Sequence, residues 1–112
     1  MPADNVEDSA VTTPLIPDPS ALAGDWRLRT VDGQDCAINL GEQAQPLEAG
    51  SLAAPVLAVD GRCAAVPGLA GWRAAPLGLE LTDAAGFAVL TFEQVGADEY
   101  VSSATGARLT RQ

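Results

Sequence analysis

Residues 77–92, Leu-Gly-Leu-Glu-Leu-Thr-Asp-Ala-Ala-Gly-Phe-Ala-Val-Leu-Thr-Phe, read as two strands joined by a turn. Leucines alternate with small or polar residues over 77–82, and apolar residues alternate again over 88–92. A period of two is that of a strand with one buried face, whereas a helix would repeat every 3.6 residues. The four residues 83–86, Asp-Ala-Ala-Gly, predict a turn. The stretch therefore predicts an antiparallel hairpin.

The same pattern extends in both directions along the chain. Alternating segments lie around residues 26–29, 36–40 and 57–59, and near Tyr100 and Leu109, with turn signals about every ten residues. No stretch of helical period exceeds one turn, which we expect at 19–24. About 89 residues then supply seven or eight short strands. This spacing is typical of an all-β domain, either an antiparallel sandwich or an up-and-down barrel.

The inward-facing positions of these strands predict the core. Because only five residues are aromatic, the core must rest mainly on aliphatic side chains, with the two tryptophans as its largest pieces. The predicted core residues are Trp26, Leu28, Ile38, Leu40, Trp72, Leu79, Leu81, Leu90, Phe92, Tyr100 and Leu109.

The composition excludes several classes of function. The 112 residues carry a net charge of −9 and contain neither His nor Lys. An acidic chain opposes binding to nucleic acid or to anionic membranes. Without His there is no imidazole base and no His metal site, and two cysteines cannot form a four-thiolate zinc site. We therefore expect a non-enzyme without metal or cofactor, and no transmembrane segment.

The polar and charged residues of the strand region form no catalytic constellation. Glu80 and Asp83 point to different places and make a poor acid–base pair. For Arg73, stacking on Trp72, pairing with a carboxylate and solvation at the surface all stay open, and we favour the last. We expect 98–99, Asp-Glu, to be a solvated turn.

Two interpretations of Cys36 and Cys63 stay open, a disulfide or two buried free thiols. A small, acidic, strand-rich domain without Lys is typical of exported proteins, which favours the bond. The spacing excludes a CxxC redox pair.

The N-terminal residues differ from the remainder. Residues 1–19 contain four acidic residues, four of the eight prolines and no basic residue, so they predict an extended arm or linker before a domain at 20–112. A solvated spacer and an arm that contacts a partner are both compatible with this composition. The apolar Leu15 and Ile16 favour the second.

Several segments taken together resemble the bacterial inhibitors of serralysin-type metalloproteases. The similarity covers residues 18–111. Its elements, in order, are Ser-Ala-Leu-Ala-Gly-Asp-Trp-Arg-Leu at 20–28, Cys-Ala-Ile-Asn-Leu at 36–40, Cys63, Gly-Trp-Arg at 71–73, Leu-x-Leu-x-Asp-x-x-Gly at 79–86, Tyr100 and Leu109.

The resemblance implies an eight-stranded antiparallel up-and-down β-barrel with one disulfide and a short N-terminal helix. It also implies tight inhibition of a secreted or periplasmic zinc protease. The barrel docks beside the active-site cleft, and an N-terminal trunk enters it. On this sequence the trunk maps onto Thr12, Thr13, Pro14, Leu15, Ile16 and Pro17.

The sequence departs from that family at its start. In those inhibitors the mature chain begins at the trunk, whereas here residues 1–11 precede Thr12. Similar barrels also occur in Gram-negative outer-membrane lipoproteins, where a linker separates the barrel from the lipid, and this tethered domain is the second hypothesis. A lipocalin-like carrier of a small apolar ligand is the third. The first two place a monomeric protein in the periplasm or cell envelope.

Overall fold

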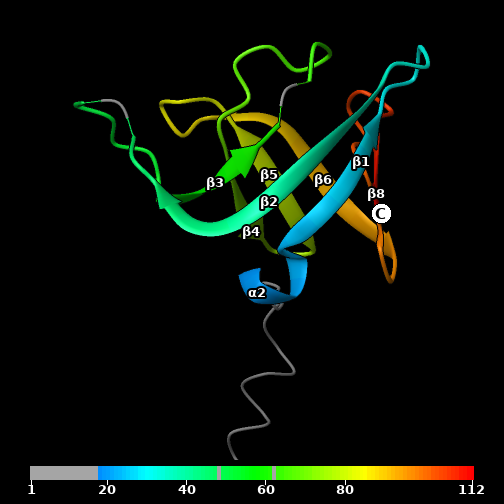
Figure 1. Ribbon diagram of the computed structural model, residues 1–112, viewed down its shortest axis with the longest axis horizontal. Coiled ribbons are helices and arrows are strands. Elements are labelled where there is room, and N and C mark those ends of the chain that lie inside the picture. Colours follow the sequence, from blue (N-terminus) through cyan, green and yellow to red (C-terminus); the bar gives the residue numbers. More distant parts are fainter. Residues whose placement is uncertain (1–17, 48, 62) are drawn as a thin grey trace, which may run out of the picture.

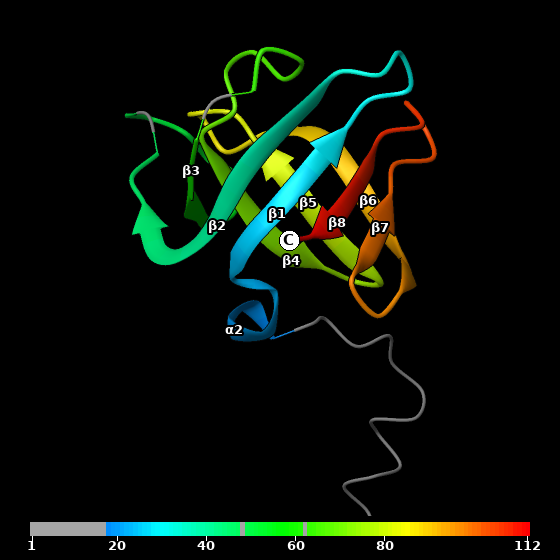
Figure 2. The ribbon, with the colours of Figure 1, turned by 45° about the vertical axis from the view of Figure 1, so that its right-hand side comes forward.

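Eight antiparallel strands close into a barrel in the part of the chain that the computed structural model describes, residues 18–47, 49–61 and 63–112 (Figure 1, Figure 2). Each strand pairs with the next along the chain, and β8 pairs with β1. The elements are α2 (Pro19–Leu22), β1 (Gly24–Arg29), β2 (Asp35–Gln45), β3 (Val56–Asp60), β4 (Gly71–Ala75), β5 (Gly78–Thr82), β6 (Ala88–Gly96), β7 (Glu99–Val101) and β8 (Arg108–Arg111). The predicted all-β up-and-down barrel is confirmed, and the sandwich is excluded.

The barrel has two ends, which we call lower and upper from their places in Figure 1. The lower end carries α2, the β4–β5 turn and the β6–β7 turn (Figure 1, Figure 2). The upper end carries the β1–β2, β5–β6 and β7–β8 connections and the longer β3–β4 loop. Strands that run up and down in turn bring these distant parts of the sequence together at each end.

Alternation along the strands fills the interior. In β1, Trp26 and Leu28 are buried while the two arginines between and after them face outward. Trp26 lies opposite Ile38 of β2, and residues directly opposite share one face of the sheet. All predicted core residues are buried except Leu90, which is partly buried and packs against the others. The large side chains Trp26, Trp72 and Phe92 are fully buried and occupy the interior of the barrel.

The β4–β5 turn differs from the predicted pattern. Leu77, expected to begin a strand, lies in the turn with a φ of 66°, and β5 begins at Gly78. A Cβ at Gly78 would lie 1.9 Å from the carbonyl oxygen of Phe92, so the close approach of β5 to β6 requires glycine here. The alternating leucines therefore begin one residue before the strand itself begins.

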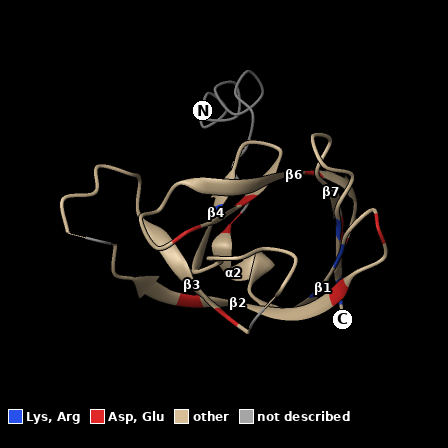
Figure 3. Cartoon of the chain, turned by 90° about the horizontal axis from the view of Figure 1, so that it is seen from above, with Lys and Arg blue, Asp and Glu red and all other residues tan. Residues whose placement is uncertain are grey.

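The arginines of the described residues lie against acidic partners. β1 and β8 are adjacent, so the segments coloured blue for arginine on these two strands lie on one side of the barrel in Figure 3. The ion pairs are Arg27–Asp35, Arg29–Asp35, Arg73–Glu80, Arg108–Glu99 and Arg111–Asp98. Hydrogen bonds from Arg29 and Arg27 lower the pKa of Asp35. These arginines therefore form no free basic patch.

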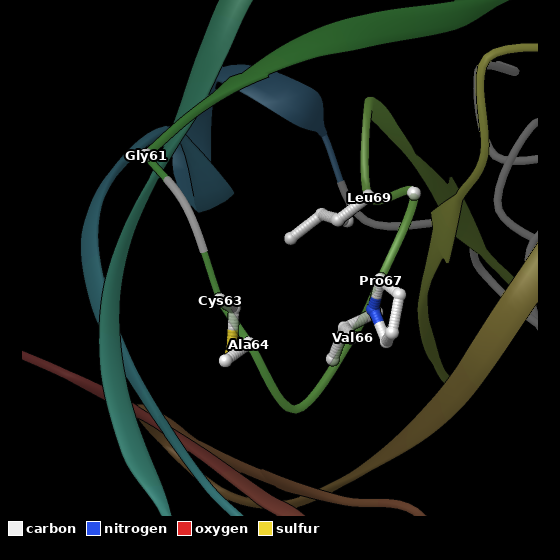
Figure 4. Close-up of a pocket in the computed structure, with 7 residues that line it drawn as sticks. Gly61, Cys63, Ala64, Val66, Pro67 and Leu69 are labelled. Atoms are coloured by element: carbon white, nitrogen blue, oxygen red, sulfur yellow. The ribbon is translucent and has the colours of Figure 1, made fainter.

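A disulfide joins Cys36 to Cys63, as the sequence favoured, with 5.5 Å between their Cα atoms. It ties the β3–β4 loop to the start of β2. Within that loop Cys63 and Val66 are buried in the core cluster, although the sequence analysis did not assign them there. The loop curves around a pocket of about 340 Å³, with Cys63 and Ala64 on one side and Val66, Pro67 and Leu69 on the other (Figure 4). The bond holds this loop over the upper end of the barrel.

We predict that reduction, or the double substitution Cys36→Ser with Cys63→Ser, lowers the free energy of unfolding by about 3.5 kcal/mol. The bond spans 27 positions and restricts the unfolded chain. Urea unfolding followed by tryptophan fluorescence measures the change. A loss below about 1 kcal/mol would show that the loop is held by its packing rather than by the bond.

Candidate functional site

The base of the N-terminal arm is set by α2. The carboxylate of Asp18 accepts hydrogen bonds from the backbone N–H of Ser20 at 3.0 Å and from its hydroxyl at 2.9 Å. Pro19 takes the first helical position, where the missing N–H costs nothing. These two bonds lower the pKa of Asp18. Asp18 is therefore the N-cap of α2.

Trp26 binds this helix from inside the barrel. Its indole N–H donates to the carbonyl oxygen of Leu22 at 2.8 Å, and Leu22 is itself buried. The ring of Tyr100 meets the ring of Trp26 edge to face, with centroids 5.6 Å apart. Trp26 is thus a core residue whose polar atom also fixes α2 to the barrel.

Arg111 of β8 closes the same contact from the other end of the sequence. Its Nη1 donates to the carbonyl of Ala23 at 3.0 Å and its Nη2 to that of Ala21 at 2.7 Å. Its guanidinium lies 4.3 Å from the centroid of the Trp26 ring, and its Nε donates to Asp98 at 3.0 Å. One side chain therefore connects α2, the buried tryptophan and the β6–β7 turn.

The backbone at the junction of α2 and β1 is adapted to this arginine. Gly24 has a φ of 126°, which L side chains rarely adopt, and a Cβ there would lie 3.2 Å from Nη1 of Arg111. We call the set of α2, Trp26, Tyr100, Asp98 and Arg111 the helix clamp. The clamp fixes the position of α2, and of its N-cap Asp18, relative to the barrel.

The charges of the clamp act on Tyr100, the single tyrosine of the chain. Burial raises the pKa of Tyr100; the Arg111 charge opposes that rise and the Asp98 charge adds to it. Because the pKa is raised in the folded state, the neutral phenol contributes stability below its ordinary pKa. That contribution is lost as the pH rises through the raised pKa.

The predicted contact residues Thr12, Thr13, Pro14, Leu15, Ile16 and Pro17 lie outside the described residues. Asp18 follows them directly, so the clamp begins where this segment ends. The sequence analysis missed Arg111. Its only signal was an arginine in a final segment that alternates with Leu109, and no sequence pattern says that this strand lies beside β1.

Comparison with protein-family models supplies the remaining observation. Residues 16–110 match the family described as protease inhibitor Inh.

The chain belongs to the Inh family of protease inhibitors.

The match starts within the predicted arm and runs into β8, so it includes α2, Trp26, Asp98 and Tyr100 of the helix clamp and ends one residue before Arg111. No curated protein matches the sequence. Membership of this family points to a protease as the partner and to a role other than catalysis.

No group of three or more His, Cys, Asp or Glu side chains that could hold a metal ion occurs in the described part of this Inh chain. Among the same residues, no helix is long and apolar enough to cross a membrane.

Arg73 is one residue whose place in the Inh barrel differs from expectation. Its side chain is 23% exposed and pairs with a carboxylate, which is one of the open alternatives and not the favoured one: its Nε donates to Glu80 at 2.7 Å, and its Nη1 donates to the carbonyls of Gly86 at 2.8 Å and Ala54 at 3.3 Å. Arg73 therefore joins the β2–β3 connection to the β5–β6 turn. A single strand pattern could not show this, because both acceptors are backbone atoms of other elements.

Two predictions about acidic residues can be compared with the structure. The side chains of Asp98 and Glu99 are 60% and 41% exposed, as expected of a solvated turn, and they also pair with Arg111 and Arg108, because β7 lies beside β8. Asp83 accepts from two backbone N–H groups of its own turn, while Glu80 faces Arg73. These two carboxylates serve separate structural contacts.

We predict that Arg111→Met lowers the free energy of unfolding by about 2 kcal/mol, because the carbonyls of Ala21 and Ala23 lose a charged donor and Trp26 loses the cation above it. Urea unfolding measures the loss. The matched control is Arg29→Met, which removes one exposed ion pair and should cost below about 1 kcal/mol. In the Arg111 variant, spectrophotometric titration should also show a still higher pKa for Tyr100. Equal losses for the two variants would contradict the role of the clamp.

Proposed function

We propose that this chain inhibits a secreted or periplasmic zinc metalloprotease of the serralysin type, with residues 12–17 as the segment that enters the active-site cleft. The observation that carries the proposal is the helix clamp, because it anchors the chain at the residue that follows this segment. The family match supports the inhibitory role. The resemblance of residues 18–111 to serralysin inhibitors supports the class of protease.

The clamp reduces the entropy that binding must overcome. An arm on a loose tether would have to order both itself and its connection to the barrel on entering a cleft. Here α2 is already held by Trp26 and Arg111, and Pro14 and Pro17 restrict the backbone of the arm itself. On this proposal, the conformational entropy that binding costs is limited to residues 12–17 themselves and does not include their attachment to the barrel.

The negative charge of residues 1–19 bears on which form of the chain acts. Of the four acidic residues, Asp4, Glu7 and Asp8 precede Thr12, and the fourth, Asp18, is engaged as the N-cap of α2. Removal of residues 1–11 would therefore leave a segment 12–17 without acidic side chains and with a free amine at Thr12. An amine is a ligand that a zinc ion of the protease could accept.

Titration of a serralysin-type protease with three forms of the protein tests the arm: the full chain, a chain starting at Thr12 and a chain starting at Asp18. The last form keeps the N-cap and Leu22, so its clamp stays intact. We expect the inhibition constant to rise by roughly 100-fold or more from the Thr12 form to the Asp18 form, because all arm contacts are lost. Equal inhibition by these two forms would refute the arm, and no inhibition by any form would refute this class of target.

We further propose that the protein works in the periplasm or cell envelope, either free or tethered to a membrane by a lipidated N-terminal linker. The disulfide supports this location, because such bonds persist in oxidising compartments. Mass spectrometry of the native N-terminus tests it. A start at or near Thr12 is the expected result for a free inhibitor. A lipid-modified start would favour the tethered form, in which the arm acts as an internal segment.

A further inference from the structure

The lower end of the barrel carries two exposed apolar side chains close to the helix clamp. Leu77 in the β4–β5 turn is 63% exposed, and Val95 near the end of β6 is 59% exposed. The carbonyl of Leu77 accepts a hydrogen bond from the backbone N–H of Gln94 at 2.8 Å. Leu77 is therefore bonded to the residue that directly precedes Val95. We call these two residues the lower rim.

The lower rim and the arm base belong to one surface. In both ribbon views α2, the β4–β5 turn and the β6–β7 turn lie at the same end of the barrel (Figure 1, Figure 2). Arg111 connects α2 to Asp98 of the β6–β7 turn, and β6 leads from Val95 directly into that turn. The position of the rim relative to residue 18 is therefore fixed by side-chain and strand contacts.

The backbone of Leu77 makes its exposure notable. Its φ of 66° lies in the left-handed region, and Leu77 is the one residue other than glycine with a positive φ in the described ranges. A bulky side chain there is unfavourable, and Gly or Asn would fit better. Because the side chain is mostly exposed, its packing in the fold does not compensate. The turn thus carries an apolar side chain at a position where folding alone would favour another residue.

We propose that Leu77 and Val95 form the barrel's own apolar contact with the protease that the arm enters, an inference that rests on the proposed function. Residues 12–17 span at most about 20 Å when fully extended. A protein that binds them must therefore come within that distance of Asp18, which precedes α2 at the lower end of the barrel. The partner surface that fits is an apolar depression beside the cleft, which removes both side chains from water.

Other exposed apolar residues do not meet this condition. Leu52 is 97% exposed, but its neighbour Ser51 donates to the carbonyl of Ala85 in the β5–β6 turn. Leu52 therefore lies by the upper end, away from the point where the arm joins the barrel (Figure 1). It serves as the matched control for the lower rim, because its side chain has the same size and greater exposure.

The test uses Leu77→Gly, Leu77→Asn, Val95→Thr and the control Leu52→Ser, each in the chain starting at Thr12. Leu77→Gly should raise the melting temperature, because the backbone strain is relieved, and raise the inhibition constant of a serralysin-type protease about tenfold. Leu77→Asn should weaken inhibition similarly while keeping a side chain at this position. Val95→Thr should weaken it several-fold, and Leu52→Ser should leave it unchanged.

Unchanged inhibition by both Leu77 variants would overturn the rim contact, as would an equal loss on changing Leu52. The chain starting at Asp18 separates the two proposals. If that form inhibits as well as the Thr12 form while the Leu77 variants inhibit more weakly, the role of the arm is refuted and the rim contact is supported. If the Asp18 form loses inhibition while the Leu77 variants keep it, the rim contact is refuted and the role of the arm is supported. No inhibition by the parent chain would overturn both.

Discussion

The pairing of β8 with β1 is the constraint on which the rest of this structure depends. It closes the barrel, so that no strand edge is left open, and it sets Arg111 directly opposite Trp26. Two residues from opposite parts of the sequence are thereby brought together at the lower end. The indole and the guanidinium then bind the carbonyls of Ala21 and Leu22 in α2 and that of its C-cap, Ala23. The strand pairing that closes the barrel therefore also places the side chains that hold the helix.

The two ends of the barrel are secured by different means. At the upper end the Cys36–Cys63 disulfide holds the β3–β4 loop, and Arg73 joins two further connections through backbone carbonyls. At the lower end the clamp provides the fixed attachment. A domain of this size buries only a limited apolar surface. An arginine that donates to several acceptors at once therefore contributes more to the stability of the fold than an exposed ion pair does. Both ends are therefore held by side-chain contacts between elements, and Asp18 lies at the lower one.

On the proposed function, the contacts at the lower end lower the entropy cost of binding a protease. A segment that enters a cleft gains affinity when little freedom is left to lose, and the clamp removes that freedom before the partner is met. Leu77 combines a backbone conformation that is unfavourable for a leucine with an exposed side chain. Such strain is typical of residues that serve binding and not folding. On the proposed function, the arm and the lower rim act together from one end of the barrel.

The sequence by itself determined the strands, the turns and the inward-facing core, because period-two alternation is local and survives in any β fold. Trp26, Leu79 and Phe92 could thus be assigned to the interior, and the resemblance supplied eight strands and the disulfide. Only the tertiary structure decided that Asp98 and Arg111 meet, that Arg73 is mostly buried, and that Leu77 lies in a turn. The reason is physical: these features depend on which strands become neighbours, and on backbone acceptors and close approaches far away along the chain. An alternating pattern records which side of a strand is buried, but not which partner lies across from it.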